Sequence, residues 1–253
     1  MNTSFLLVTG ASRGIGAATA RLAAAHGFDI AINYSRDEAA AETVADAVRA
    51  LGRCALLVRA DVADEAQVLA MFAALDRHTQ DGGGRLAGLV NNAGVVDVAA
   101  RVDAMSGARL QRMFAVNVFG TMLCAREAVR RMSSKYGGAG GAIVNVSSAA
   151  SRLGSPGQYV DYAAAKGAVD VFTLGLAREV AAEGVRVNAV RPGIIDTDIH
   201  ASGGLPDRAK QLAPQVPMQR AGSADEVAQA IVWLLSPAAS YTTGALLDVT
   251  GGR

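Results

Sequence analysis

Residues 5 to 16 read Phe-Leu-Leu-Val-Thr-Gly-Ala-Ser-Arg-Gly-Ile-Gly, a short apolar run followed by a glycine-rich turn. The apolar residues 5–8 are typical of a strand that is buried on both faces of a parallel sheet. An alanine-rich stretch follows to about residue 27 and predicts a helix. The free N–H groups and the positive dipole end of this helix would face the turn, where they would stabilise a bound pyrophosphate.

The three glycines of this turn have separate expected roles. Gly10 permits a tight turn, Gly14 lets the backbone approach a ligand, and Gly16 lets the helix pack closely on the strand. Their spacing, G-x-x-x-G-x-G, differs from the common G-x-G-x-x-G fingerprint, and a plain structural turn is the alternative interpretation. The position between a strand and a helix favours a dinucleotide site, for which we expect contacts from Gly10, Ser12, Arg13, Gly14, Ile15 and Gly16.

Strand and helix patterns alternate along the whole chain. Further strands are predicted at 29–33, 54–58, 86–90, 142–146, 185–190 and 245–249, and helices at 37–51, 64–78, 108–136, 157–182 and 224–235. This alternation predicts one α/β domain over residues 1–253, with a doubly wound parallel sheet and helices on both faces. Residues 194–220 contain three prolines and a glycine pair, so we expect a substrate loop or lid there.

The composition is that of a compact soluble protein, with 51% hydrophobic and 19% charged residues and a net charge of +1. No basic run indicates nucleic-acid binding, and no apolar stretch approaches the roughly 20 residues that span a bilayer. The N-terminus shows no secretory signal, so a cytoplasmic protein is expected. The three histidines and two cysteines are scattered and form no metal-ligand pattern.

The predicted helix at 157–182 carries apolar residues around most of its circumference. Such a helix needs cover on more than one face, and the sheet supplies only one. A second subunit is the natural source of the other cover. The sequence therefore predicts a homo-oligomer.

The end of the second predicted strand bears on the choice of cofactor. An NAD site usually places a carboxylate here to bind the ribose 2′-hydroxyl. This chain instead has Asn33, Tyr34, Ser35 and Arg36, and it has Arg13 inside the glycine turn. Two guanidinium groups without a carboxylate suit a 2′-phosphate, so NADP(H) is predicted over NAD(H). Solvated surface arginines are the alternative interpretation, more so for Arg36 than for Arg13.

Two further strand ends offer candidate cofactor contacts. Asp61 and Val62 follow the third strand, where they would contact the adenine, or Asp61 would simply cap the next helix. The small residues after the fourth strand would let a ribose lie against the backbone, although by themselves they also suit a turn. These residues are Asn91, Asn92, Ala93 and Gly94.

Tyr162 and Lys166 are the sharpest chemical signal in the sequence. Residues four apart share one helix face, and only alanines separate these two. An ammonium near a phenol favours the phenolate, so we expect Lys166 to lower the pKa of Tyr162 from about 10 towards neutrality. Tyr162 could then act as an acid for a carbonyl or a base for an alcohol, with Ser148 bound to the same oxygen. Alone, a Tyr–Lys pair is more often surface decoration.

The glycine turn, Asn91 to Gly94, Asn117, Ser148, Tyr162-x-x-x-Lys166 and the run Pro192 to Thr197 together resemble the short-chain dehydrogenase/reductase family. The resemblance covers essentially the whole chain and implies a Rossmann-type fold with a sheet of about seven strands, assembled as a homotetramer or homodimer. It also implies catalytic roles: Tyr162 as acid/base, Lys166 holding the nicotinamide ribose, Ser148 orienting the carbonyl and Asn117 positioning a water. Near the nicotinamide it implies Pro192, Gly193, Ile195 and Thr197.

One interval departs from the family pattern, because Ser148 and Tyr162 are 14 residues apart, one more than is commonest. Ser147 is adjacent, and strand alternation would allow only one of the two serines to face the cofactor. We expect that residue to be Ser148, by alignment with the family pattern. Weaker candidates for the substrate pocket, from position alone, are Val96, Ser155, Gln158, Ile195 and His200.

The expected activity is NADPH-dependent reduction of a ketone or aldehyde, such as a 3-oxoacyl thioester, to an alcohol. Within the family, the overall similarity is to 3-oxoacyl-carrier-protein reductases and to sugar or polyol dehydrogenases. An NADP(H)-binding sensor without turnover is the alternative of another class, and the complete set Asn117, Ser148, Tyr162 and Lys166 argues against it. Epimerases and dehydratases that act on nucleotide sugars share the chemistry but are usually longer.

Overall fold

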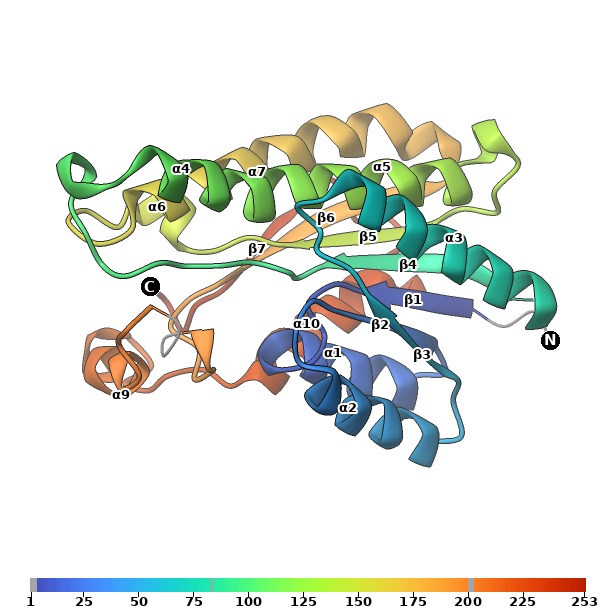
Figure 1. Cartoon of the computed structure of the whole chain (residues 1–253), viewed down its shortest axis with the longest axis horizontal. Helices are drawn as coiled ribbons and strands as arrows, with labels where there is room; N and C mark the ends of the chain where they lie inside the picture. Colours follow the sequence, from blue (N-terminus) through green and yellow to red (C-terminus); the bar gives the residue numbers. More distant parts are fainter. Residues whose placement is uncertain (1–3, 83, 200–202) are drawn as a thin grey trace.

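Seven parallel strands form one sheet in the order β3-β2-β1-β4-β5-β6-β7 (Figure 1). This parallel sheet confirms the predicted doubly wound architecture. The computed structural model describes residues 4–82, 84–199 and 203–253. The strands are β1 Ser4–Val8, β2 Asp29–Tyr34, β3 Ala55–Arg59, β4 Arg85–Asn91, β5 Gly141–Val146, β6 Val185–Pro192 and β7 Leu246–Val249.

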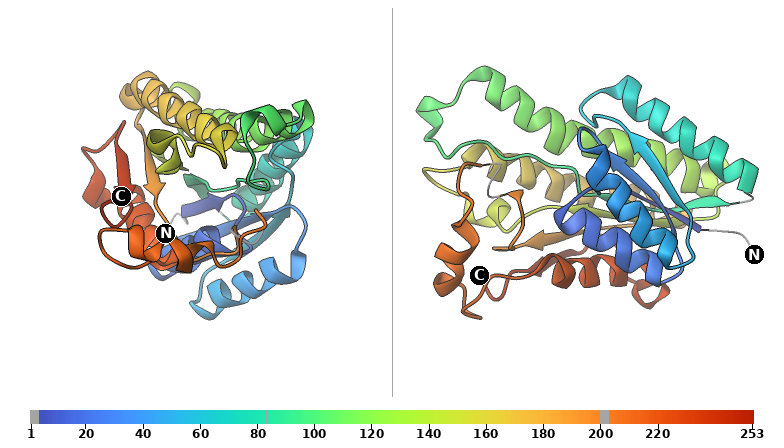
Figure 2. Two further views of the ribbon diagram at one scale, coloured as in Figure 1. Left: turned by 90° about the vertical axis from the view of Figure 1, so that its left-hand side faces the viewer. Right: turned by 60° about the horizontal axis from the view of Figure 1, so that its bottom comes forward.

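Helices cover both faces of the sheet, as Figure 1 shows and Figure 2 repeats from other directions. One layer contains α1 Gly14–Ala25, α2 Glu38–Ala50 and α10 Ala224–Leu235; the other contains α3 Glu65–Gly82, α4 Gly107–Phe114, α5 Gly120–Met132 and α7 Val160–Val180. The short helices α6 Ala150–Leu153 and α9 Arg208–Leu212 lie at the end of the molecule that also holds the C-terminus (Figure 1).

The first strand shows how the sequence builds two cores. Successive side chains of a strand point to opposite faces. Leu6 and Val8 accordingly join the apolar core beneath α1, α2 and α10, whereas Phe5 and Leu7 join the core beneath α3, α5 and α7. An unbroken apolar run is therefore what a strand covered on both faces requires.

The strand order reverses at β1, which pairs with β2 on one side and with β4 on the other. In open parallel sheets such a reversal opens a crevice at the carboxyl ends of the strands, and ligands bind there. The glycine turn follows β1 and the segment Asn92 to Gly94 follows β4. The topology thus brings both segments to one crevice.

Several predicted boundaries need correction. The helix predicted at 108–136 is divided by a widened π-helical turn, Ala115–Phe119, into α4 and α5. The helix expected from 157 begins at Val160, because Gly157 has a φ of +72°, which lies outside the right-handed helical region. The helix expected to end at 78 continues to Gly82. Its last turn is polar, so the spacing of apolar residues gave no sign that the helix continues there. Residues 194–220 also contain α9 and a 3₁₀ turn, Ala213–Gln215.

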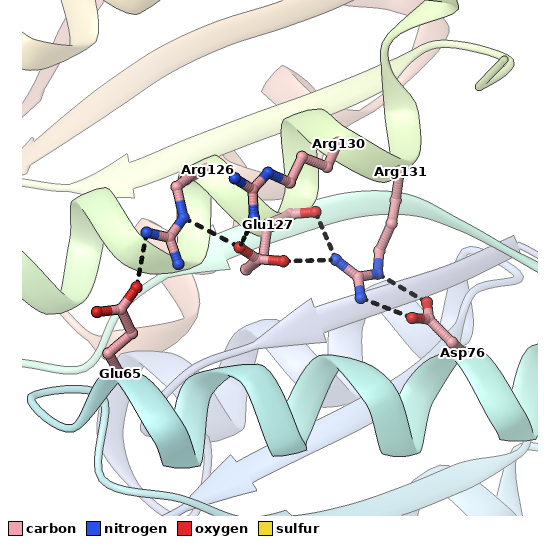
Figure 3. Close-up of polar contacts among 6 residues, drawn as sticks. All are labelled: Glu65, Asp76, Arg126, Glu127, Arg130 and Arg131. Carbon is pink, nitrogen blue, oxygen red and sulfur yellow. Dashed lines mark hydrogen bonds and ion pairs between the residues drawn. The ribbon is translucent and has the colours of Figure 1, made fainter. Parts of the chain in front are cut away.

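An ion-pair cluster joins α5 to α3 (Figure 3). Glu127, only 3% exposed, accepts hydrogen bonds from Arg126, Arg130 and Arg131 at 2.8–3.0 Å. Arg131 reaches on to Asp76 of α3 through two contacts of 2.6 and 2.7 Å. Burial raises the pKa of Glu127, but the hydrogen bonds from Arg131 and Arg126 outweigh it and leave the pKa below its usual range.

Within the described ranges of the chain, no helix combines the length and the apolar character that crossing a bilayer requires.

Candidate active site

Two adjoining cavities occupy the carboxyl edge of the sheet. The larger, of about 800 Å³, runs along the glycine turn and the ends of β2 and β3. The smaller, of about 170 Å³, lies over Tyr162 and Ser148. The two cavities share the lining residues Ile15, Asn92, Gly94, Val96, Thr197 and Ile199. They therefore form one continuous cleft with a wide part and a narrow part.

Glycine is favoured at three positions of this turn, by backbone conformation or by close packing. Gly10 and Gly14 have φ values of +60° and +55°, which only glycine adopts readily. A Cβ atom on Gly16 would lie 2.5 Å from Nδ2 of Asn92 and 2.6 Å from the Gly10 carbonyl oxygen. Gly10 and Gly14 line the larger cavity, whereas Gly16 serves the packing of α1 on the turn.

Asn33 holds the glycine turn against the neighbouring strand. Its buried side chain accepts a hydrogen bond from the Gly10 amide at 3.2 Å and donates to the carbonyl oxygens of Val58 and Ala60. All of these partners are backbone groups of the turn and of the β3 strand end. Asn33 lines the larger cavity, but its amide is engaged in bracing the cavity wall.

Asn91 and Asn92 are also engaged by the protein itself. The amide of Asn92 donates to the carbonyl oxygens of Thr9 and Gly10, each at 2.9 Å. Asn91 is buried, and its amide donates to Asn145 Oδ1 at 2.9 Å and to the Thr121 carbonyl oxygen. Asn92 lines both cavities, whereas Asn91 lines neither. The sequence grouped the two together, but only Asn92 reaches the cleft.

The wall beyond β2 and β3 combines two exposed arginines with two carboxylates. Arg13 and Arg36 line the larger cavity, and neither forms an ion pair with another described residue. Asp37 accepts a hydrogen bond from the Ala40 amide and so caps α2. Asp61 accepts one from the Ala63 amide at 3.0 Å. Both carboxylates thus have local backbone partners, which leaves the guanidinium groups as the cationic donors of this wall.

The alternative role suggested for Asp61, capping the following helix, belongs to another residue. Asp64 Oδ1 accepts a hydrogen bond from the Gln67 amide in the first turn of α3. Asp61 instead closes a tight turn just before that helix. Asp61 and Val62 both line the larger cavity, as do Tyr34 and Ser35.

Tyr162 and Ser148 meet in the smaller cavity. Tyr162 lies in the first turn of α7 and lines this cavity together with Ser148, which follows β5 and whose side chain acts to lower the pKa of Tyr162. The Ser148 Oγ atom also accepts a hydrogen bond from the Ala150 amide at 3.1 Å. Ser147 also lines the cavity, but its hydroxyl donates to the Lys166 carbonyl oxygen. Ser148 is therefore the serine that is directed at Tyr162.

Lys166 and Asn117 both lie close to Gly94. A Cβ atom on Gly94 would be 2.8 Å from Asn117 Oδ1 and 3.6 Å from Lys166 Nζ. The Lys166 ammonium donates to the Val146 carbonyl oxygen at 2.7 Å. Asn117 lies in the π-helical turn; its amide oxygen accepts from the Val95 amide and its nitrogen donates to the Val95 and Met113 carbonyl oxygens. Asn117 itself lines neither cavity.

The ionisation of Tyr162 differs from the sequence-based expectation. Burial raises the pKa of Tyr162 to about 12, and the hydrogen bond with Ser148 offsets only part of this effect. Burial also lowers the pKa of Lys166 to about 8, although Asp170 acts in the opposite direction. The Lys166 Nζ atom is 5.6 Å from the centre of the Tyr162 ring and bonds a backbone oxygen. The expected lowering of the Tyr162 pKa by Lys166 is therefore wrong for this structure, because burial dominates.

Most of the predicted substrate residues surround the smaller cavity. Val96, Ser155 and Ile195 line it, as do the predicted cofactor residues Pro192, Gly193 and Thr197. Gln158 does not, because its side chain is exposed and accepts a hydrogen bond from Arg208. His200 lies outside the described residues.

Sequence reasoning missed several residues of this cavity. Tyr159 lies three positions before Tyr162 but has no lysine four residues on, so the sequence pattern does not mark it as a site residue. Arg208 lies in the 194–220 segment, and no pattern in the sequence marks which of its residues turn inward. The other residues missed are Ala149, Ala150, Leu153, Ile199 and Arg253.

Comparison with known proteins agrees with this architecture. Residues 10–253 match a family model described as Enoyl-(Acyl carrier protein) reductase. An uncharacterised oxidoreductase of Escherichia coli K12, YgfF, is 55% identical, with 98% of each chain covered. A cis-4-hydroxycyclohexanecarboxylate dehydrogenase of Sinomonas cyclohexanicum is 43% identical, with 97% of this chain and 94% of the relative covered. A 3-oxoacyl-[acyl-carrier-protein] reductase of Synechocystis is 39% identical, with 97% and 95% covered.

Solved structures of similar sequence have the same fold as this chain. A short-chain dehydrogenase of Burkholderia cenocepacia J2315, crystallised in complex with NADP, superposes with a TM-score of 0.86 at 34% identity, covering 98% of this chain and 96% of that one. The seven-stranded parallel sheet and the cavity lined by Ser148, Tyr162 and Lys166 are consistent with these likenesses. On these grounds the chain belongs to the short-chain dehydrogenase/reductase family of oxidoreductases.

Proposed function

We propose that the protein interconverts a carbonyl compound and an alcohol with NADP(H) as the cofactor. The observation that carries the proposal is that Tyr162 and Ser148 line one small cavity, which adjoins a much larger one and shares lining residues with it. A proton donor and a second hydrogen-bonding group at one point are what a carbonyl oxygen requires as it becomes an alcohol.

The larger cavity fits a phosphorylated dinucleotide. Its volume of about 800 Å³ suits a ligand of that size, and the glycine turn leaves backbone exposed at the start of α1. Arg13 and Arg36 supply cationic donors for a 2′-phosphate, whereas Asp37 and Asp61 already accept backbone hydrogen bonds. NADPH, when bound, supplies the hydride that a carbonyl carbon accepts.

The residues of the smaller cavity handle the oxygen of the substrate. In reduction, the Tyr162 O–H donates its proton to the carbonyl oxygen while Ser148 donates a hydrogen bond to the same atom. The high pKa of Tyr162 keeps the phenol protonated at neutral pH, so it is ready to act as the acid. Lys166 lies near Tyr162, with Nζ 5.6 Å from the centre of the ring, and its pKa of about 8 lets it gain or lose a proton close to neutral pH.

The size of the smaller cavity favours a compact substrate. Its volume of about 170 Å³ lies below the roughly 300–1,000 Å³ common for drug-sized ligands. A small cyclic or short-chain ketone fits this space better than a long acyl thioester does. The relative that acts on cis-4-hydroxycyclohexanecarboxylate supports the same size class.

The test is NADPH oxidation with a panel of carbonyls by the wild type and Tyr162→Phe. We expect turnover to fall about 10²- to 10⁴-fold in the variant, with NADPH affinity unchanged. Tyr241→Phe is the matched control, since Tyr241 is fully exposed and remote from both cavities. Full turnover by Tyr162→Phe would remove the proposed role. Tight NADPH binding without turnover of any carbonyl would instead favour the sensor function.

We also propose that the protein forms a homodimer or homotetramer. Val171 of α7 is 70% exposed, and Phe119 of the adjoining π-helical turn is 56% exposed. Apolar side chains left uncovered on neighbouring elements are typical of a surface that associates. Light scattering after gel filtration should give a multiple of the chain mass for the wild type and a smaller mass for Val171→Asp. A wild type that elutes as a monomer would contradict this proposal.

A further inference from the structure

We propose that Arg208 binds a carboxylate of the substrate, so that the substrates are compact oxo acids and the corresponding hydroxy acids. The inference rests on the proposed function, in that it takes the cavity over Tyr162 as the substrate site. Arg208 begins α9 and lines that cavity together with Tyr162 and Ser148. It therefore brings a permanent positive charge to the place where the substrate would lie.

Two neighbours fix the orientation of Arg208. Its guanidinium carbon lies 5.1 Å from the centre of the Tyr159 ring, a cation–π distance. Its Nη1 atom donates to Gln158 Oε1 at 2.7 Å. The contact with the Tyr159 ring and the hydrogen bond to Gln158 restrict the orientation of the planar guanidinium group. Because the group is already oriented, less conformational entropy is lost when it binds a ligand.

Arg208 has no anionic partner among the described residues, unlike the half-buried arginines that form ion pairs. Arg109 is paired with Asp161, and Arg191 with Asp170. Arg186 donates to four backbone carbonyl oxygens. For Arg208, the described residues supply one neutral amide oxygen and one ring face. Its remaining N–H donors are thus available for a bidentate contact with a carboxylate.

The surroundings also select an anion. The described lining of this cavity includes three basic residues, Lys166, Arg208 and Arg253, and no acidic residue. Apolar side chains also line this cavity, and by excluding water they strengthen the attraction between opposite charges. They include Val96, Leu153, Ile194, Ile195 and Ile199. An arginine in a cavity whose described lining has no acidic residue, and which also holds the proton donor, is a suitable site for a short acid with its carbonyl at the far end.

Equilibrium binding tests the assignment without any turnover. The NADPH-loaded protein is titrated with cyclohexanecarboxylate and with the neutral cyclohexanecarboxamide, by calorimetry. We expect the wild type to bind the carboxylate about 10- to 100-fold more tightly than the amide, and Arg208→Met to lose this preference. Arg208→Lys should retain only part of it, because lysine keeps the charge but not the fork. Lys210→Met is the matched control, because it removes an exposed charge from the same helix.

Turnover separates this inference from the proposed function. The wild type should reduce 4-oxocyclohexanecarboxylate with a kcat/KM at least 10-fold above that of its methyl ester, and Arg208→Met should equalise the two. Equal reduction of acid and ester by the wild type would overturn the role of Arg208 and leave carbonyl reduction intact. Carboxylate binding that depends on Arg208, without reduction of any ketone, would support the binding site and count against the proposed reaction. Unchanged carboxylate preference in a folded Arg208→Met that still binds NADPH would refute the inference.

Discussion

Arg109 and Asp161 form a buried two-pronged ion pair that ties α4 to the first turn of α7. The Nε–Oδ2 distance is 2.8 Å and the Nη2–Oδ1 distance is 3.2 Å. The two side chains are 10% and 0% exposed. Asp161 directly precedes Tyr162, so this pair fixes the turn of helix that presents the phenol to Ser148.

Replacing Arg109 with Met should destabilise the fold and impair catalysis together. Removal of one partner leaves the Asp161 carboxylate buried without its counter-ion, a change that costs about 3–5 kcal/mol. The measurement is chemical denaturation combined with kcat. Arg101→Met is the control, because the Arg101–Asp103 pair is exposed and should change the free energy of unfolding by less than about 1 kcal/mol. Equal effects of the two substitutions would contradict a supporting role for the buried pair.

Lys166 should make the stability of the fold rise with pH in the alkaline range. Burial lowers the pKa of Lys166 to about 8 from an ordinary value of 10.5. Between these values the unfolded chain binds more protons than the folded one, so the free energy of unfolding increases as the pH rises. Relative to Lys166→Met, the wild type should gain about 2 kcal/mol between pH 7 and pH 9.5.

The comparison with Lys166→Met cancels the titration of every other group that both proteins share. The upper limit of pH 9.5 also avoids Tyr162, whose folded pKa is raised to about 12 and which would begin to destabilise the folded state at higher pH. A difference in the free energy of unfolding that stays constant over this range would show that Lys166 is not desolvated in the folded protein.

Arg131 and Arg130 are adjacent but should differ in their effect on stability. Arg131 bridges Glu127 and Asp76, and its side chain is 22% exposed, whereas that of Arg130 is 55% exposed and contacts Glu127 alone (Figure 3). We expect Arg131→Met to lower the free energy of unfolding by about 2–4 kcal/mol and Arg130→Met by less than about 1 kcal/mol. Thermal and urea unfolding of the two variants provide the measurement, and a larger loss in Arg130→Met would contradict the bridging role.

The sequence was sufficient for the fold because the signals that specify it are local. The apolar run at 5–8, the glycine turn and the repeated strand–helix alternation each follow from neighbouring residues and predict a parallel sheet. The predicted helix boundaries were wrong where backbone hydrogen bonding, and not the spacing of apolar residues, determines where a helix ends. This is the case at the end of α3 and at the π-helical turn around Asn117. Propensity does not reveal this widened turn or the hydrogen bonds that Asn117, within it, makes with Val95 and Met113.

The sequence predicted those features of the site that depend on residue type and on spacing along the chain. Tyr162 and Lys166 meet at the cavity as their spacing predicts, and Ser148 joins them as the family pattern predicts. The sequence could not show that the amide of Asn33 is engaged by Gly10, Val58 and Ala60, since these are contacts with distant backbone. Burial likewise decides the direction of the Tyr162 pKa, and burial is a property of the whole fold. Arg208 was missed for the same reason.

Arg13 and Arg36 should set the preference for NADPH over NADH. Both line the cavity beside the end of β2, and neither has an ion-pair partner among the described residues. A 2′-phosphate would receive charge-assisted hydrogen bonds from them that NADH cannot accept. Each substitution, Arg13→Met or Arg36→Met, should reduce the ratio of NADPH to NADH affinity by about 10-fold, mainly by weakening NADPH binding. Arg21→Met, which removes an exposed charge on α1 outside the cavity, should leave the ratio unchanged. Fluorescence titration with both cofactors measures the ratio directly. A ratio unaffected by Arg36→Met but lowered by Arg13→Met would make Arg36 a solvated surface residue and leave Arg13 as the phosphate ligand.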